Sequence, residues 1–452
     1  MIWKSVVEGS KPELKRTLGL MQVILYGVGL ILGAGIYVII GDVSAISGNM
    51  MWISFIFAAI IASLTGLSYA ELASMYPKSA AEYIYIKNAY GKNFLAIFVG
   101  CLTIFVAITS AATVAIGFSG YLSVFLPYTS PIVYAVILVI ALSLVNFYGI
   151  RESMWTNSIF TIIEILGLVI IIVAGLLMSS GNYVSYFEVP PSLGTSFGSV
   201  ILAIMTSTAL IFFAYYGFEN IANLSEETRD PTRVIPRALL VSIILTSIIY
   251  LLVAISSISL IGWKELSSSE APLAVVAEKA FGYQGIVLLS FIALFATTNT
   301  VLMMLVSGSR IIFGMAKDSS IPNIFTMIHK YNRTPWAAAF ATMFLTIAAI
   351  VLSSGNINTA ASLSVFGIFI VFAFVNFSVI WLRFKQPNVN RTFMSPFKLK
   401  RFPVLAGLGL LMVSIMLFLF SHTIILSSSF LIGILFLISI SLDRYNKKTI
   451  PS

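Results

Sequence analysis

Backbone groups, rather than reactive side chains, offer the clearest chemistry in this sequence. Four glycines lie within residues 27–35, in the middle of the first long apolar segment, about 18–46. Each glycine costs a helix interior about 1 kcal/mol relative to alanine, so a membrane helix with four is packed very closely or interrupted. An interruption frees N–H and C=O groups that must be buried in protein or face a water-filled cavity. We therefore predict that residues 31–35 are unwound and bind a ligand through their backbone, with Gly33 and Gly35 marking the break.

A second interruption is predicted at Gly217 in the sixth apolar segment, where a carboxylate, Glu219, and an amide, Asn220, follow directly. Interrupted segments at matching positions in two halves of a transporter are the best sequence pointer to a binding site at the bilayer midplane. Close helix packing at small-xxx-small spacing, which Gly29 and Gly33 fit, is the alternative explanation. The pairing of the two segments favours the binding site.

Three further residues are candidates for ion coupling or gating. Glu164 lies well inside an apolar segment, and an ionisable group at that depth is a functional candidate by default. It could exchange a proton, hold Na⁺ with freed carbonyls, or be a structural carboxylate paired with a polar neighbour. Glu219 could relay protons, sense substrate charge or cap the half-helix that follows it. Thr298 is polar at mid-depth and could face the site, although bonding to its own helix is the commoner role.

Other chemistries find no support in the sequence. The two histidines, His329 and His422, are far apart and have no cysteine or carboxylate cluster nearby. The glycine spacing does not match a dinucleotide-binding loop, and no strand precedes it. We expect no enzyme activity, metal site or cofactor, apart from possible coupling to H⁺ or Na⁺. The single cysteine, Cys101, lies in an apolar segment, which excludes an internal disulfide and makes a disulfide-linked partner subunit unexpected.

The elements that must position these groups are membrane helices. The 452 residues are 59% apolar and 10% charged, whereas soluble domains carry about 25% charged residues. A spanning helix needs about 20 apolar residues, and twelve segments qualify. They are about 18–47, 52–75, 93–126, 131–150, 155–179, 198–223, 236–261, 284–316, 337–353, 358–382, 403–422 and 425–442. We expect an all-α polytopic membrane protein with 12 transmembrane helices in one domain, residues 1–452, in the lipid bilayer.

The distribution of Lys and Arg predicts the orientation. With the N-terminus in the cytoplasm, all of the 26 basic residues except Lys264 and Lys279 fall on the inner side. This predicts a multi-pass protein of the cell membrane with both termini cytoplasmic. It also explains the net charge of +9 without a nucleic-acid partner.

The spacing of the two interrupted spans predicts internal symmetry. Spans 1 and 6 are five apart, and five spans per half place the halves in opposite orientations. We therefore expect a 5+5 inverted repeat, at about 18–179 and 198–382, with broken helices 1 and 6 and two extra helices within 403–442.

Several stretches together resemble the amino acid–polyamine–organocation (APC) family of amino acid permeases. They are Gly27–Gly41, Tyr69–Leu72 with Tyr76-Pro77, Glu82–Gly91, Gly217–Glu219 with Glu226-Glu227 and Pro231–Ala238, and Ser309–Asp318 with Ile321-Pro322 and Thr334-Pro335. The resemblance implies a secondary active transporter that works by alternating access, proton-coupled or exchanging. The aromatic residues of the sixth span favour neutral amino acids as substrates.

The resemblance also implies how a substrate would bind. The N–H groups of Ala34 and Gly35 would hold the carboxylate, at the start of the outer half-helix. The carbonyls of Ile31, Phe213 and Tyr216 would hold the ammonium group. The ring of Phe213 would close over the substrate, and Gly33 and Gly217 would mark the two breaks.

Three departures from the family pattern bear on these expectations. Ala34 stands where the family often has serine, so a hydroxyl contact to the carboxylate is lost, and Ala80-Ala81 stands where the family commonly has two glycines. Many members have a lysine near the position of Glu164, so the charge here is reversed. Glu219, an acid on the substrate side, keeps a polyamine or cationic amino acid exchanger open as an alternative. The same fold could also serve as an amino-acid-sensing receptor subunit.

Overall fold

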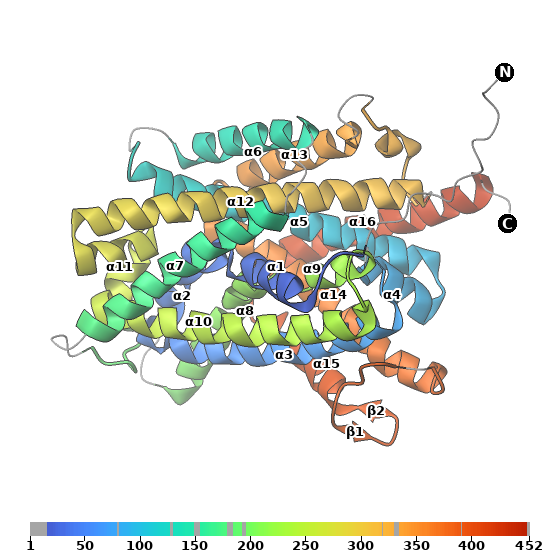
Figure 1. Ribbon diagram of the computed structural model, residues 1–452, viewed down its shortest axis with the longest axis horizontal. Coiled ribbons are helices and arrows are strands. Elements are labelled where there is room, and N and C mark those ends of the chain that lie inside the picture. The colour runs from blue at the N-terminus through green and yellow to red at the C-terminus, as the bar shows by residue number, and fades with distance from the viewer. Residues whose placement is uncertain are drawn as a thin grey trace.

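The computed structural model describes residues 16–78, 81–126, 130–148, 154–178, 184–191, 196–318, 320–329, 334–389 and 391–449. Long helices run roughly along one axis, with short helices and one small hairpin at their ends (Figure 1). The longer helices are α1 (Leu20–Leu32), α2 (Ala34–Ser47), α3 (Met51–Met75), α5 (Asn93–Ser123), α6 (Pro131–Tyr148), α7 (Met154–Met178), α8 (Phe197–Tyr215), α10 (Pro231–Ser267), α12 (Tyr283–Lys317), α13 (Trp336–Leu352), α14 (Ile357–Lys385), α15 (Val404–Met416) and α16 (His422–Thr449). The shorter elements are η1 (Gly48–Met50), α4 (Ala81–Tyr90), α9 (Asn220–Asn223), η4 (Leu224–Glu226), α11 (Pro272–Phe281), η5 (Asn323–Thr326), β1 (Lys398–Leu399) and β2 (Phe402–Pro403).

The all-helical membrane character is confirmed. In the described ranges, nine helical stretches are long and apolar enough to cross a membrane, and one of them, Leu20–Met75, holds α1, α2 and α3. Two shorter apolar helices, α13 and α15, lie outside that set. The count of twelve spans and the inverted repeat therefore stay predictions. Helices α4 and α11 and the β1–β2 hairpin were not expected. Helix α11 forms in the link between α10 and α12, where Pro272 supplies a favourable first helical residue.

The interrupted helices lie at the centre of the bundle. Helix α1 packs against α10 and α7, and α2 packs against α8 and α10, while α3, α5, α12 and α14 lie around them (Figure 1). A Cβ at Gly27 would lie 2.3 Å from Cδ1 of Ile221, and one at Gly29 would lie 2.0 Å from Oγ1 of Thr161. These two glycines therefore permit close packing, as expected, and an alanine at either position would force its neighbour to move.

A buried ion cluster ties α3 to α14 at one end of the bundle. Nε and a terminal nitrogen of Arg383 donate to the two carboxylate oxygens of Glu71 at 2.9 and 2.6 Å. Nε of Arg391 lies 3.4 Å from Glu71, and the N–H of Ser395 donates to the same carboxylate at 3.0 Å. Glu71 is 1% exposed and Arg383 is 5% exposed, so this ion pair is held away from water.

Candidate functional site

The first helix break is confined to one residue. Gly33 has φ −25° and ψ −152° and separates α1 from α2. Its own N–H still donates to the carbonyl of Gly29 at 3.1 Å, so α1 is helical through Leu32. The N–H of Ala34 donates to Oγ1 of Thr300 in α12 at 3.1 Å. The expected unwinding of residues 31–35 is therefore too wide, and Gly35 lies within α2.

The second break follows Tyr215, the last residue of α8. Tyr216 has an extended ψ of 131°, and Gly217 has φ +127°, a conformation that side chains disfavour. The carboxylate of Glu219 accepts the Gly217 N–H at 3.0 Å and an Nδ2 hydrogen of Asn220 at 3.2 Å. Glu219 therefore binds the backbone of the break itself, and its side chain makes no hydrogen bond that caps α9 (Asn220–Asn223), contrary to the capping role considered from the sequence.

Contacts between the backbones bring the two breaks together. A Cβ at Gly35 would lie 2.6 Å from Cα of Ala214 in α8, and one at Gly217 would lie 2.9 Å from the Leu30 carbonyl oxygen. Glycine at both positions lets the backbones of the two interrupted helices touch. From α10, the hydroxyl of Tyr250 lies within hydrogen-bond distance of two carbonyl oxygens, those of Ile31 and Ala214. We call this meeting point the junction.

The junction brings together the seven predicted substrate-binding residues. They are Ile31, Gly33, Ala34, Gly35, Phe213, Tyr216 and Gly217, and all are buried. Phe213 is 4% exposed and Tyr216 is 7% exposed. Some of the backbone groups assigned to a substrate already have partners within the protein: Ile31 accepts from Tyr250, Ala34 donates to Thr300, and the Phe213 carbonyl accepts the Tyr216 N–H at 3.3 Å. A ligand at the junction would exchange these bonds for its own.

Glu164 in α7 lies at the level of the first break. One turn before it, Thr161 contacts Gly29, and beyond it Gly167 lies beside the Tyr37 hydroxyl, which donates to the Glu164 carbonyl at 3.1 Å. The side chain is 1% exposed. In the described ranges the carboxylate makes no well-formed hydrogen bond, but the side chain of Asn299 in α12 lies near enough to donate to it. Pairing with a polar neighbour on another helix, through Asn299, therefore stays open beside the coupling role.

Sequence reasoning did not identify the side chains that bond to the junction. Thr298 is half-buried in α12, but it is Thr300, two residues on, that accepts the Ala34 N–H. Two residues turn a helix by about 200°, so the two threonines face different ways. Tyr250 was also missed. The only available signal was a polar group within an apolar segment, and many such residues serve their own helix.

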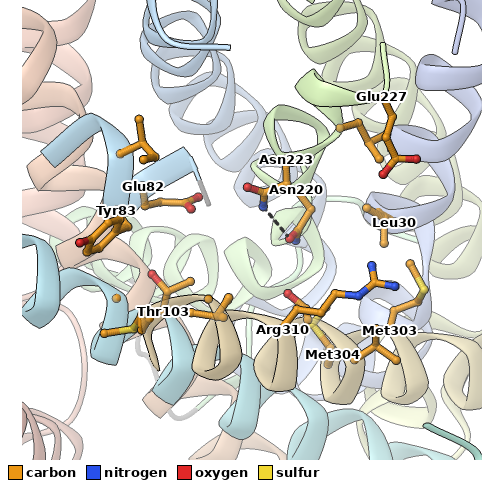
Figure 2. A pocket seen from close by; sticks show the side chains of 18 of the residues that line it. Leu30, Glu82, Tyr83, Thr103, Asn220, Asn223, Glu227, Met303, Met304 and Arg310 are labelled. Atoms are coloured by element: carbon orange, nitrogen blue, oxygen red, sulfur yellow. Dashed lines mark hydrogen bonds between the residues drawn. The ribbon is translucent and has the colours of Figure 1, made fainter. Parts of the chain in front are cut away.

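A cavity of about 630 Å³ adjoins the junction. It is lined by α1, α4, α5, α9, α12 and the segment that includes Glu227 (Figure 2). The side chain of Leu30 lines the cavity while its carbonyl touches Gly217, so Leu30 separates the cavity from the junction. On the α4 wall, the Tyr69 hydroxyl donates to Glu82 at 3.0 Å, and burial raises the pKa of Glu82 above its ordinary value. None of the seven predicted binding residues lines this cavity.

Comparison with known proteins identifies the family. The pattern of the amino acid permease family matches residues 18–447. A branched-chain amino acid permease of Bacillus subtilis is 28% identical over 419 residues, which are 88% of this chain and 87% of that one. A large neutral amino acids transporter small subunit 2 of Mus musculus is 28% identical over 433 residues, 89% of this chain and 80% of the relative. A methylthioribose transporter of Bacillus subtilis is 26% identical over 413 residues, 86% of each chain.

Solved structures share the fold. A mutant manganese transporter of Eremococcus coleocola superposes with a TM-score of 0.63, over 97% of both chains at 12% identity. At that identity the likeness concerns architecture alone. The family pattern, by contrast, covers nearly the whole chain and confirms the resemblance seen in its motifs. The chain belongs to the amino acid permease family and is a membrane transporter, not an enzyme.

Proposed function

We propose that this permease is a secondary active transporter that moves neutral amino acids across the cell membrane by alternating access. The observation that carries the proposal is the junction, where the N-terminus of α2 meets the C-terminal ends of α1 and α8. A helix N-terminus favours an anion, and freed C-terminal carbonyls favour a cation. The junction therefore suits the carboxylate and ammonium groups of one amino acid.

The proposed binding mode uses backbone groups that are already positioned. The N–H groups of Ala34 and Gly35 would take the carboxylate, and the carbonyls of Ile31, Phe213 and Tyr216 would take the ammonium group. Because these residues are buried, a substrate would reach them only after a conformational change. The described conformation, closed at the junction with a cavity on the α4 side, fits one stage of such a cycle.

Neutral substrates are favoured by the aromatic surroundings and by the relatives. Phe212, Phe213, Tyr215 and Tyr216 are buried at the end of α8, and their rings suit an apolar side chain. Two relatives are named for branched-chain and large neutral amino acids. Glu164 would provide coupling, to a proton or to Na⁺, because its ionisable carboxylate is buried beside the first break, with Asn299 as its polar neighbour.

The proposed topology is that predicted from the sequence. Twelve spans would form one domain with an inverted repeat, both termini would be cytoplasmic, and the α4 side would face the cytoplasm. No nucleic acid or disulfide-linked subunit would take part. Because Lys87 in α4 and Lys317 and Arg310 in α12 lie on the α4 side, this orientation follows the positive-inside rule.

Uptake and counterflow of radiolabelled L-leucine into proteoliposomes of the purified protein test the proposal. We expect uptake that unlabelled leucine, isoleucine and valine compete for. Methylthioribose, which lacks both a carboxylate and an ammonium group, should compete weakly, and putrescine and arginine should also compete weakly. Stronger competition by methylthioribose or by the cationic compounds would reject the neutral amino acid assignment. Leucine binding without counterflow would favour a sensor.

A further inference from the structure

The charged groups that line the cavity do not all compensate one another. Lys87 and Asp318 form an ion pair, with Nζ 3.0 Å from Oδ2, and Glu82 accepts the Tyr69 hydroxyl. Arg310 and Glu227 are left. Neither side chain has an ion pair or a hydrogen bond in the part of the chain that the structure describes. Of the charged side chains that line the cavity, Arg310 and Glu227 thus have neither an ion pair nor a hydrogen bond in the described residues, whereas Glu82 has the neutral Tyr69 hydroxyl as its donor.

These two side chains come from different elements and converge on the same residue. Arg310 belongs to α12, and Glu227 follows η4. In Figure 2 both side chains point toward Leu30, at the end of the cavity nearest the junction. The backbone at Glu227 is fixed, because its carbonyl accepts the N–H groups of Thr17 and Leu18 at 2.9 and 3.0 Å. Arg310 and Glu227 therefore lie on two different walls of the cavity. A bound molecule that carries a negative and a positive group could contact both side chains.

The rest of this wall fits the body of such a molecule. Met303 and Met304 line the cavity beside Arg310, and methionine side chains adapt to apolar groups of different shape. The side-chain amides of Asn220 and Asn223 lie across from them (Figure 2), bonded to each other at 3.4 Å. A guanidinium group binds a carboxylate through two parallel N–H donors, and a carboxylate accepts from an ammonium group.

We infer that the cavity contains a second amino acid binding site, with Arg310 for the carboxylate, Glu227 for the ammonium group and the methionine floor for an apolar side chain. We call it the staging site. It lies one residue layer from the junction, across Leu30, and would hold an amino acid on its way between the junction and the α4 side. This inference rests on the proposed transport of amino acids and adds a second position on the path.

Equilibrium binding of radiolabelled L-leucine to the purified full chain tests the inference through its stoichiometry. We expect about two leucines per wild-type chain at saturation. Arg310→Gln and Glu227→Gln should each bind one, and affinity at the lost site should fall about tenfold or more, as for a charged hydrogen bond. Phe213→Ala should lose the junction site and keep the staging site. Arg229→Gln removes an exposed arginine that does not line the cavity and should still bind two.

The outcomes separate this inference from the proposed function. One leucine per wild-type chain, with leucine uptake intact, would reject the staging site alone. Two leucines that Arg310→Gln and Glu227→Gln both retain would place the second site elsewhere and also reject it. No leucine binding and no uptake would reject the proposed function and the staging site together. Arg310→Lys keeps the charge without the paired donors and should show intermediate affinity, which a general loss of folding would not produce.

Discussion

Thr300→Val tests whether the start of α2 is the carboxylate site. In the structure, Thr300 Oγ1 accepts the N–H of Ala34 at 3.1 Å and donates its hydrogen to the carbonyl of Ala296 at 2.9 Å. Valine has nearly the same shape but can neither accept nor donate. The substitution therefore removes one acceptor from a buried helix N-terminus with little change in packing.

The two states of the transporter should respond differently. Without substrate, the Ala34 N–H loses its partner, which costs about 1 kcal/mol. With substrate, the carboxylate takes that N–H, and the hydroxyl is no longer needed as its acceptor. The cost then falls on the empty state only, so leucine should bind about fivefold more tightly to the variant. The variant should unfold at a lower temperature when empty and close to the wild-type temperature when saturated.

Leucine titration and thermal unfolding of the purified variant measure both effects. Thr342→Val is the matched control, because the Thr342 hydroxyl donates to its own helix at 2.8 Å, as Thr300 does, and no backbone N–H donates to it in the described ranges. Its leucine affinity should equal that of the wild type. Weaker binding by Thr300→Val would show that the hydroxyl itself contacts the substrate. Unchanged binding would show that the carboxylate does not use the Ala34 N–H.

Four other substitutions have defined outcomes. Gly217→Ala should abolish leucine uptake at normal expression, because the residue has φ +127° and its Cβ would lie 2.9 Å from a carbonyl oxygen; normal uptake would mean that the second break tolerates displacement. Glu71→Gln should destabilise the protein by about 3–5 kcal/mol in denaturant, since it leaves the Arg383 charge buried without its anion, and a loss under 1 kcal/mol would contradict this account. Glu82→Gln should flatten the pH dependence of the free energy of unfolding. The folded state holds the Glu82 proton more tightly than the unfolded chain does, so the stability of the wild type should fall relative to that of the variant as pH rises from about 4. Parallel pH curves for the two proteins would show that burial of Glu82 does not contribute. Glu164→Gln should remove the dependence of uptake on pH or on Na⁺, and an unchanged dependence on both would exclude Glu164 from coupling.

The sequence was informative where a residue type is unfavourable for a continuous helix and therefore needs a structural reason. A run of glycines in an apolar segment predicted a break, and the structure has one at Gly33. Gly217 was likewise informative, because its positive φ requires glycine. The predicted width of the first break, residues 31–35, was wrong, because helical hydrogen bonds persist up to the N–H of Gly33. Gly29 permits close packing, as expected, because Thr161 occupies the space where its Cβ would lie.

The partners of the junction could not be found by local reasoning. Thr300 lies 266 residues from Ala34, and Tyr250 lies 219 residues from Ile31. No pattern within either segment encodes such a contact, which depends on how α10 and α12 pack against α1. The cavity was missed for the same reason, because its charged residues come from separate elements.

The ion cluster at Glu71 limits how the transporter can move. Separating the ends of α3 and α14 would strand a carboxylate and a guanidinium away from water, at a cost of several kcal/mol. These ends, with the segment around Ser395 that the same carboxylate holds, should therefore travel as one rigid body. Spin labels on α3 and α14 at this end should keep a constant separation through the cycle, and any change of distance should appear between this body and α1 or α8.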